Sequence, residues 1–205
     1  NINIKEPAFE KCLSYPTLSP ENEKGYVIPY CDCPLDKDKV GEMVYMDILN
    51  RAKRYVHIMS PYLILDGEME TAICFAAERG VEVKIILPGV PDKLAPYSLA
   101  KSHYSRLLDS GVEIFEYKPG FIHAKSFVAD DVEGVVGTIN LDYRSLYHHF
   151  ECAVYCYESD CIKDIEKDFQ ETLEKSRKIT KKTIWKGRPL LKPLSFVLKI
   201  IAPLL

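Results

Sequence analysis

The most constraining feature of this chain is a regular alternation of short apolar runs with longer amphipathic segments. The amphipathic segments are about ten to seventeen residues long, and apolar side chains recur in them at helical spacing. Two of these segments stop directly before Gly80 and Gly111, as helices commonly do. Strands that alternate with helices predict an α/β fold with a mixed, mostly parallel β-sheet and helices on both faces.

The predicted elements fill one domain, for which 205 residues with 47% hydrophobic composition suffice. Residues 1–24 contain three Pro and no periodicity, so they are interpreted as a linker or lead-in. The domain is predicted over 25–176, followed by a basic and apolar C-terminal tail over 177–205. Strands are expected over 25–30, 55–59, 81–87, 112–117, 123–130, 134–140 and 152–157. Helices are expected over 37–53, 68–79, 94–110 and 160–176.

The charge of the chain is unevenly distributed. The net charge is −3, but residues 175–205 carry nine Lys or Arg and no acidic residue. The other 174 residues therefore hold 18 basic and 30 acidic groups, a balance of −12. An acidic body disfavours a nucleic-acid groove, which needs a basic face, and leaves room for an anionic partner at the C-terminus.

Cysteine and membrane signals restrict the class further. The seven Cys show no repeated spacing, and Cys31-Asp-Cys33 lacks the spacing of a zinc knuckle, so we expect reduced thiols and no metal site. No apolar run of 18 residues is present, so no transmembrane helix is predicted in this chain. There is no signal peptide and the first residue is not Met, which favours a piece of a longer polypeptide.

Candidate site residues gather between Phe121 and Glu151. In an extended strand His123 and Lys125 would point to the same face, which places an imidazole beside an ammonium. The next strand ends at Thr138 and Asn140, whose small polar side chains suit phosphate binding. Lys and Asn can bind phosphate oxygens, and an imidazole can attack phosphorus or hold a proton for the leaving oxygen.

Two carboxylates complete the candidates. Glu151 lies in a strand that could pair with the others, and it could accept a hydrogen bond from the second ring nitrogen of His123. An exposed charge at a sheet edge is the alternative for Glu151. Asp130 follows His123 by an odd number of residues, which favours a structural role such as pairing with Arg144 or capping backbone amides.

The motifs themselves resemble a known superfamily. His123, Lys125 and Asp130 form an H-x-K-x4-D pattern, and residues 137–145 read G-T-x-N-x-D-x-R-S. Together these resemble the signature of the phospholipase D superfamily. Ser60-Pro61-Tyr62, Pro91-Asp92-Lys93 and the terminal Pro-Leu-Leu further resemble the C-terminal half of bacterial cardiolipin synthases. One departure is His149, where the family usually has Asn.

The resemblance implies a specific chemistry. Members carry two such motifs, one His forms a phosphohistidine, and the other protonates the leaving group without metal or other cofactor. In cardiolipin synthases a phosphatidyl group passes between two phosphatidylglycerol molecules and glycerol is released. By resemblance His123, Lys125 and Asp130 are catalytic, Lys125, Asn140 and Thr138 bind phosphate, and Glu151 orients the imidazole. The chain would be half of a site, completed by an N-terminal half or by a second copy.

The tail gives an independent indication of a membrane surface. Residues 175–192 hold eight basic residues together with Trp185, and residues 194–205 are almost wholly apolar. Such a pattern favours docking on an anionic bilayer, at roughly 1 kcal/mol per Lys or Arg near the surface. A helix packed on the domain is the alternative. We expect a peripheral, cytoplasm-facing position at the cell membrane, with transmembrane anchors in an N-terminal part.

Two other functions remain open from sequence. A homodimeric phospholipase D-like phosphodiesterase or nuclease would use the same motif, although the acidic body disfavours nucleic acid. A lipid-binding module without activity could also retain the pocket. The intact His123, Lys125 and Asn140 favour an enzyme.

Overall fold

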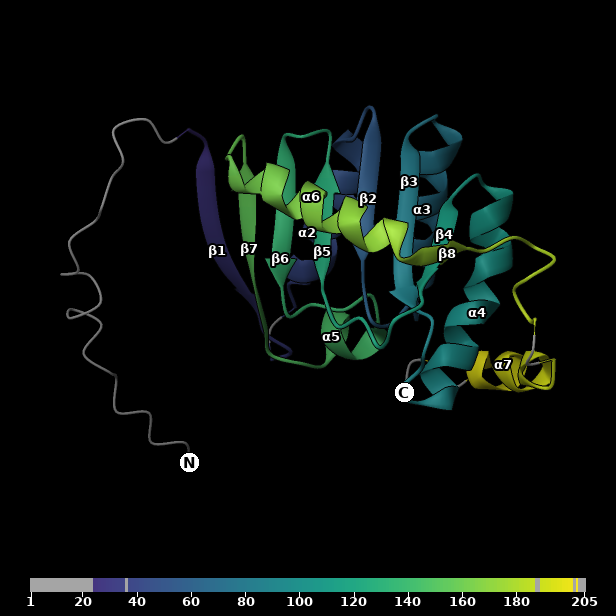
Figure 1. Ribbon diagram of the computed structural model, residues 1–205. Coiled ribbons are helices and arrows are strands. Elements are labelled where there is room, and N and C mark those ends of the chain that lie inside the picture. Colours follow the sequence, from purple (N-terminus) through teal and green to yellow (C-terminus); the bar gives the residue numbers. More distant parts are fainter. Residues whose placement is uncertain (1–23, 36, 187–188, 201, 203–205) are drawn as a thin grey trace.

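The computed structural model describes residues 24–35, 37–186, 189–200 and 202 (Figure 1). Apart from Lys24, the predicted lead-in lies outside the described residues. The described part of the chain builds one eight-stranded sheet with the strand order β1-β7-β6-β5-β2-β3-β4-β8. The strands are β1 (Tyr26–Asp32), β2 (Tyr55–Met59), β3 (Glu82–Pro88), β4 (Glu113–Tyr117), β5 (Ser126–Ala129), β6 (Glu133–Gly137), β7 (Glu151–Tyr157) and β8 (Ser176–Lys178).

The helices largely follow the predicted amphipathic segments. They are α2 (Val40–Arg51), α3 (Gly67–Glu78), α4 (Leu94–Asp109), α5 (Tyr143–Tyr147), α6 (Cys161–Glu174) and α7 (Leu191–Ile200). Gly80 and Gly111 follow α3 and α4 with φ angles of 91° and 97°, the left-handed conformation that glycine adopts without steric cost. The short helix α5 was not predicted.

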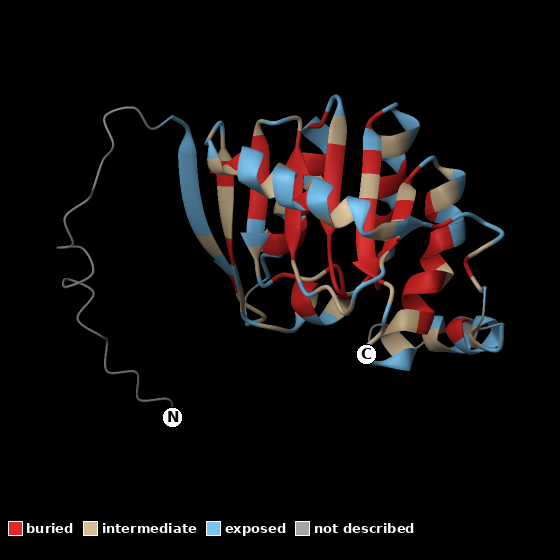
Figure 2. Cartoon of the chain, viewed as in Figure 1, coloured by how far each residue is buried: buried red, intermediate tan, exposed pale blue. Residues whose placement is uncertain are grey.

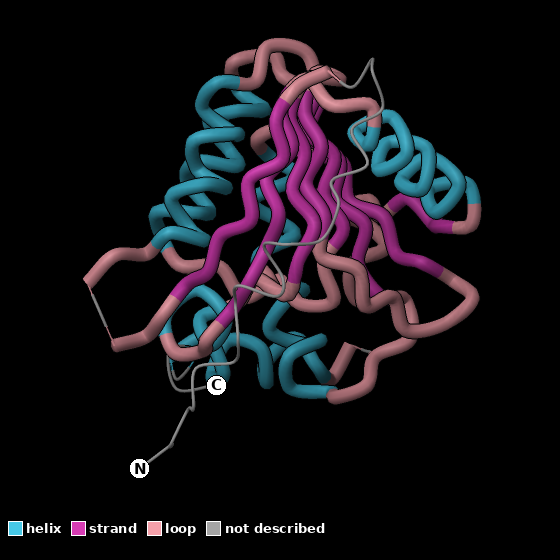
Figure 3. The backbone as a smooth tube through the Cα atoms, turned by 90° about the vertical axis from the view of Figure 1, so that its left-hand side faces the viewer, coloured by secondary structure: helices cyan, strands magenta, loops and turns pink. Residues whose placement is uncertain are grey.

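Helices cover both faces of the sheet, as predicted (Figure 3). On one face, α2, α3 and α4 pack on alternate strand residues such as Val56 and Ile58 to form the main core. On the other face, Met59 and Ile86 pack against Phe169 of α6. Figure 2 shows that buried residues concentrate in the central strands, whereas β1 is mostly exposed. One helix thus covers the face opposite the main core.

The predicted predominance of parallel strands is wrong. Among the eight described strands, the pairings β2–β3 and β3–β4 are parallel and the other five are antiparallel. The physical reason is the short connection between β5 and β6. A few residues can link antiparallel neighbours only, since a parallel pair needs a crossover of a dozen or more. The antiparallel half of the sheet carries the phosphate-site motifs.

The predicted boundary after residue 176 also needs correction. It falls inside β8, which pairs antiparallel with β4 at the edge of the sheet. Ile179 and Ile184 are buried in the main core, with Trp185 packed against it, so the domain continues through the first part of the tail. Further on, α7 packs on α4, where Ala202 is buried with Leu99.

Candidate functional site: a phosphate pocket beside α6

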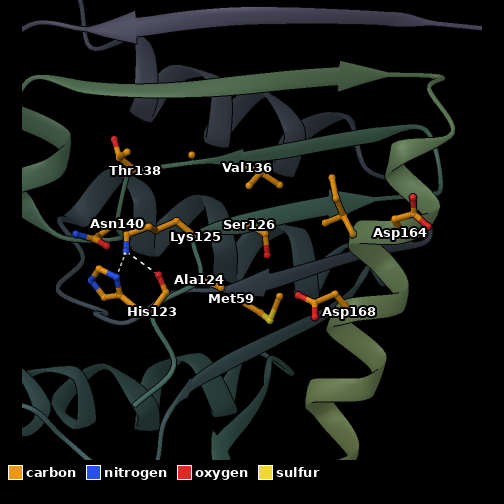
Figure 4. Close-up of a pocket in the computed structure, with 12 residues that line it drawn as sticks. Met59, His123, Ala124, Lys125, Ser126, Val136, Thr138, Asn140, Asp164 and Asp168 are labelled. Atoms are coloured by element: carbon orange, nitrogen blue, oxygen red, sulfur yellow. Dashed lines mark hydrogen bonds between the residues drawn. The ribbon is translucent and has the colours of Figure 1, made fainter. Parts of the chain in front are cut away.

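A pocket of about 700 Å³ lies between α6 and the ends of β2, β5 and β6. Its apolar wall comes from four residues: Met59, Ala124, Val136 and Ile165. Its polar lining consists of His123, Lys125, Ser126, Thr138, Asn140, Asp164 and Asp168. Figure 4 shows His123, Lys125 and Asn140 close together at one end, with the two α6 aspartates at the other. The pocket therefore has a cationic end and an acidic end.

His123 and Lys125 lie side by side, as the sequence predicted. Lys125 Nζ is 3.1 Å from His123 Nδ1 and donates a hydrogen bond of 2.7 Å to the His123 carbonyl oxygen. The predicted strand over 123–130 begins only at Ser126, and the two residues occupy the extended segment before it. An ammonium carries three N–H donors, so Lys125 retains one for a phosphate oxygen in the pocket.

Burial changes the electrostatics of this pair. The Lys125 side chain is mostly buried, and this burial lowers the pKa of its ammonium, although Glu151 and Asp142 nearby act in the opposite direction. Because a charged ammonium can only donate, His123 Nδ1 accepts from Lys125 and the ring proton sits on Nε2. The imidazole is thereby held in one tautomer.

Asn140 reaches the same end of the pocket from the loop after β6. Its Nδ2 donates to Ser145 Oγ at 3.0 Å, and its buried Oδ1 has no hydrogen-bond partner in the described residues. Exchanging the two ends of the amide lets Oδ1 accept from the Ser145 hydroxyl and releases two N–H donors. Asn140 then supplies the donor that a phosphate oxygen needs. Ser145 is itself held by Asp142, which accepts from its backbone N–H at 2.8 Å and caps α5.

Thr138 lines the pocket, and its side chain bonds to that of Glu151. The Thr138 hydroxyl donates to Glu151 and accepts from the Cys152 amide at 3.0 Å, so its single proton is engaged within β6 and β7. Glu151 contacts Thr138 and lies 3.6 Å from His149 Nδ1, whereas Lys125 occupies the Nδ1 of His123. Strand β7 pairs with β6 and not with β5, which keeps Glu151 from His123. Within this chain, Glu151 therefore does not orient that imidazole.

The unusual His149 is part of the same arrangement. Its side chain is partly exposed. When the ring is protonated, its positive charge offsets the negative charges of the Glu151 and Asp142 carboxylates.

Asp130 lies at the opposite end of β5 from His123, so the catalytic role implied by the resemblance is not supported. Its carboxylate accepts three backbone hydrogen bonds, from Lys53, Arg54 and Tyr55, at 2.7, 2.8 and 2.9 Å. Partial burial opposes ionisation, but these amides outweigh it and lower the pKa of Asp130. The predicted capping of backbone amides is confirmed, at the start of β2. The alternative partner Arg144 is not used, and Asp130 contacts Arg54 instead.

Sequence reasoning missed the α6 side of the pocket. Asp164 and Asp168 were not singled out because acidic residues on an amphipathic helix normally face solvent. Here one helix crosses the face of the sheet from β7 toward β4, so residues flanking its apolar stripe border the pocket. The spacing of four residues between the two aspartates places them on the same side of α6 and was the available signal.

The arrangement can bind and polarise a phosphate. Lys125 supplies positive charge, Asn140 supplies amide donors, and His123 presents a ring nitrogen beside them. In the described part of the chain, no cluster of three or more His, Cys, Asp or Glu is arranged to hold a metal ion. The described residues thus place one His, one Lys and one Asn at the cationic end of this pocket.

Comparison with known proteins identifies the family. The family model described as "Cardiolipin synthase, PLD-like domain" matches residues 45–173, a span that includes His123, Lys125 and Asn140. The chain belongs to this family. The family model, together with the fold and the pocket, confirms the resemblance drawn from the two motifs.

The relatives show how much of such a protein this chain represents. An uncharacterized protein of Streptococcus mutans is 63% identical over 88% of this chain and 39% of its own length. A cardiolipin synthase of Geobacillus is 34% identical over 92% of this chain and 38% of its own length. The chain thus spans less than half the length of these curated relatives.

A solved structure shows the same fold. The phosphatidylserine synthase of Haemophilus influenzae superposes with a TM-score of 0.69 at 18% identity, covering 87% of this chain and 48% of that chain. At that identity the likeness establishes the fold alone, which is the phospholipase D-like α/β fold.

Proposed function

We propose that this chain supplies one half of an active site that transfers a phosphatidyl group between two phosphatidylglycerol molecules. The products are cardiolipin and glycerol. The observation that carries the proposal is the convergence of His123, Lys125 and Asn140 in one pocket of a cardiolipin synthase family member. Lys125 and Asn140 bind the phosphate oxygens, and the imidazole of His123 takes part in the transfer.

The transfer proceeds in two balanced steps. A ring nitrogen of one histidine bonds to the phosphorus of the first lipid, the P–O bond to glycerol breaks, and a second histidine gives a proton to the leaving glycerol oxygen. The terminal hydroxyl of the second phosphatidylglycerol then attacks phosphorus and gives its proton to the second histidine. The P–N bond breaks, so two phosphatidylglycerols yield one cardiolipin and one glycerol.

Lys125 occupies Nδ1 of His123, so Nε2 is the ring nitrogen left to act at the phosphate. When the ring is protonated to the imidazolium, Nε2 can give its proton to a leaving oxygen, and Lys125 keeps its bond to the His123 carbonyl oxygen. We assign His123 this proton-donor role, and the nucleophilic histidine then comes from another half-site. The chain covers 38% of the Geobacillus relative, which supports a further half in the same polypeptide. A second copy of this chain is the other source.

The C-terminal tail provides the membrane contact in this proposal. Three apolar side chains are exposed here: Leu190 directly before α7, and Leu194 and Val197 on it, with exposed fractions of 85%, 42% and 59%. Lys192 and Lys199 of α7 are interspersed with them. Exposed apolar side chains interspersed with lysines suit the surface of an anionic bilayer. In the described part of the chain, no helix has the length and apolar character needed to cross a membrane. We therefore propose peripheral contact at the cytoplasmic face of the cell membrane.

The direct test follows both products. The complete gene product and this chain alone are each incubated with phosphatidylglycerol vesicles, and cardiolipin and glycerol are quantified. The proposal expects one glycerol per cardiolipin with the complete product. Phosphatidic acid as the only lipid product, or no reaction, would reject the transfer. Activity of this chain alone would assign the second half-site to another copy.

A further inference from the structure

A second cavity, of about 340 Å³, adjoins the phosphate pocket and shares Asn140 with it. Its other polar lining comes from three separate segments: Tyr62 after β2, Lys93 before α4, and Asp142, Arg144 and His149 around α5. Ile64 and Pro96 supply apolar contacts. We call this space the Arg144 cavity.

The lining of the Arg144 cavity holds two cations, Lys93 and Arg144, and one carboxylate, that of Asp142. Other arginines of the domain are ion-paired, for example Arg54 with Asp131 and Arg106 with Glu70, both at 2.8 Å. Lys93 and Arg144 form no ion pair with the described residues within 4.0 Å. Two cations that form no ion pair, against one carboxylate in the lining, leave the cavity with a positive balance that favours an anionic ligand.

The acidic residues nearby are already engaged. The carboxylate of Asp142 accepts the Ser145 amide at 2.8 Å, which holds it on α5, and burial raises its pKa above the ordinary value. Asp92, next to Lys93, accepts the Tyr62 hydroxyl at 2.6 Å and the Lys93 amide at 2.7 Å. These contacts leave the cations as the groups available to a ligand.

The start of α4 adds an independent preference for an anion. Lys93 is the N-cap of this 16-residue helix, and its side chain makes no capping hydrogen bond. The first backbone N–H groups of α4 therefore receive no hydrogen bond from the Lys93 side chain. These N–H groups lie at the positive end of the helix dipole. Lys93 and Pro96 of this turn line the cavity, so the dipole acts on whatever binds there.

The cavity is also connected to His123. The Tyr62 and Phe121 rings are 6.1 Å apart between centroids, and the Phe121 and His123 rings are 5.8 Å apart. Asn140 lines both spaces. An anion in the Arg144 cavity thus lies about one side chain away from the phosphate pocket. In cardiolipin a single glycerol separates the two phosphates. The acceptor phosphate therefore has to bind in a space next to the one that holds the reacting phosphorus, as the Arg144 cavity lies next to the phosphate pocket.

We propose that the Arg144 cavity binds the phosphate of the acceptor lipid and presents its glycerol hydroxyl to the phosphate pocket. This assignment rests on the proposed transfer between two phosphatidylglycerols. Lys93 and Arg144 hold the acceptor phosphate, and the α4 amides add hydrogen bonds. Such a subsite would select an anionic acceptor over water, and so favour transfer over hydrolysis.

A binding experiment tests the cavity without relying on activity. The ¹⁵N-labelled chain is titrated with glycerophosphoglycerol (the soluble headgroup), with inorganic phosphate and with glycerol, and the amide signals of Leu94 and Ala95 are followed. The headgroup is expected to shift both signals, and Lys93→Gln and Arg144→Gln are each expected to weaken its binding about tenfold. Lys167→Gln, which changes an exposed lysine on α6, is the matched control.

The outcomes separate the sources of the anion. Headgroup affinity unchanged in both variants, or shifts confined to the segment around Ala124, would overturn the subsite. Equal affinity for inorganic phosphate and headgroup would indicate a site for free anions and overturn the acceptor assignment. In the complete gene product, Arg144→Gln should lower the ratio of cardiolipin to phosphatidic acid about fivefold, and an unchanged ratio would contradict the proposal. If the wild type forms no cardiolipin, the proposed function fails, while the titration still decides whether the cavity binds the headgroup.

Discussion

Replacing Asp130 by Ala should destabilise the domain by about 3–4 kcal/mol. The carboxylate accepts three backbone amides at the start of β2, two of them exposed and the third, from Tyr55, partly buried. Taking about 0.5 kcal/mol for each exposed bond and about 1–2 kcal/mol for the buried one gives about 2–3 kcal/mol. Asp130 also has a φ of 56°, a left-handed conformation that Ala adopts less readily than Asp, which adds about 1 kcal/mol.

Urea unfolding followed by circular dichroism measures this effect. With a slope of about 2 kcal/mol per M, the midpoint should fall by about 1.5–2 M. Asp130→Asn retains the backbone preference and one acceptor oxygen, so we expect a loss of only about 1 kcal/mol. Asp131→Asn is the matched control, because Asp131 has a similar φ of 61° but binds the exposed Arg54 side chain. An Asp130→Ala midpoint within 0.3 M of the wild type would refute the structural role.

Three further predictions concern pH and lipid contact. Burial and Asp66 raise the pKa of Glu42 to about 7. Because the folded state holds the Glu42 proton more tightly, this carboxyl contributes stability below pH 4.5 that is lost as the pH rises to about 7. Glu42→Gln should remove this decline in the urea midpoint. Parallel midpoint-against-pH profiles for the wild type and the variant would contradict the prediction. Because burial lowers the pKa of Lys125, phosphate binding measured by NMR should weaken at a pH below the ordinary lysine value of 10.5. Lys125→Arg should bind phosphate independently of pH in that range, since arginine stays charged. An equal decline in both proteins would contradict the phosphate-binding role of Lys125. Leu194→Ser with Val197→Ser should reduce co-sedimentation with phosphatidylglycerol vesicles about fivefold, and unchanged binding would contradict the tail contact.

The sequence predicted local features of the site and missed several that depend on register. The contact between His123 and Lys125 follows from their spacing in an extended segment, whether or not a strand forms there. The position of Glu151 does not follow in the same way. It depends on β7 pairing with β6 and β1, and strand order cannot be read from alternation alone. Thr138 was assigned to phosphate because it is a small polar residue at the end of a predicted strand. The sequence did not indicate that its hydroxyl bonds to Glu151 and Cys152 across the β6–β7 pairing.

Other differences had signals in the sequence. The turn at Asp130 and Asp131 is too short for a crossover, and aspartates tolerate the left-handed conformation that both adopt, with φ of 56° and 61°. Together these features predict an antiparallel hairpin, which the alternation of strands and helices obscured. The Arg144 cavity had no such signal, because Tyr62, Lys93 and Arg144 meet only after three distant segments fold together.

The measurement that tests the central claim most directly is cardiolipin formation by the complete gene product carrying His123→Gln. His148→Gln is the control, since His148 is exposed and lies outside the phosphate pocket and the Arg144 cavity. If His123 carries the transfer, its substitution should lower the rate of cardiolipin and glycerol formation by at least about a hundredfold, the lower range for loss of a general acid, while His148→Gln retains the wild-type rate. Cardiolipin formed at the wild-type rate by folded His123→Gln protein would contradict the catalytic role of His123.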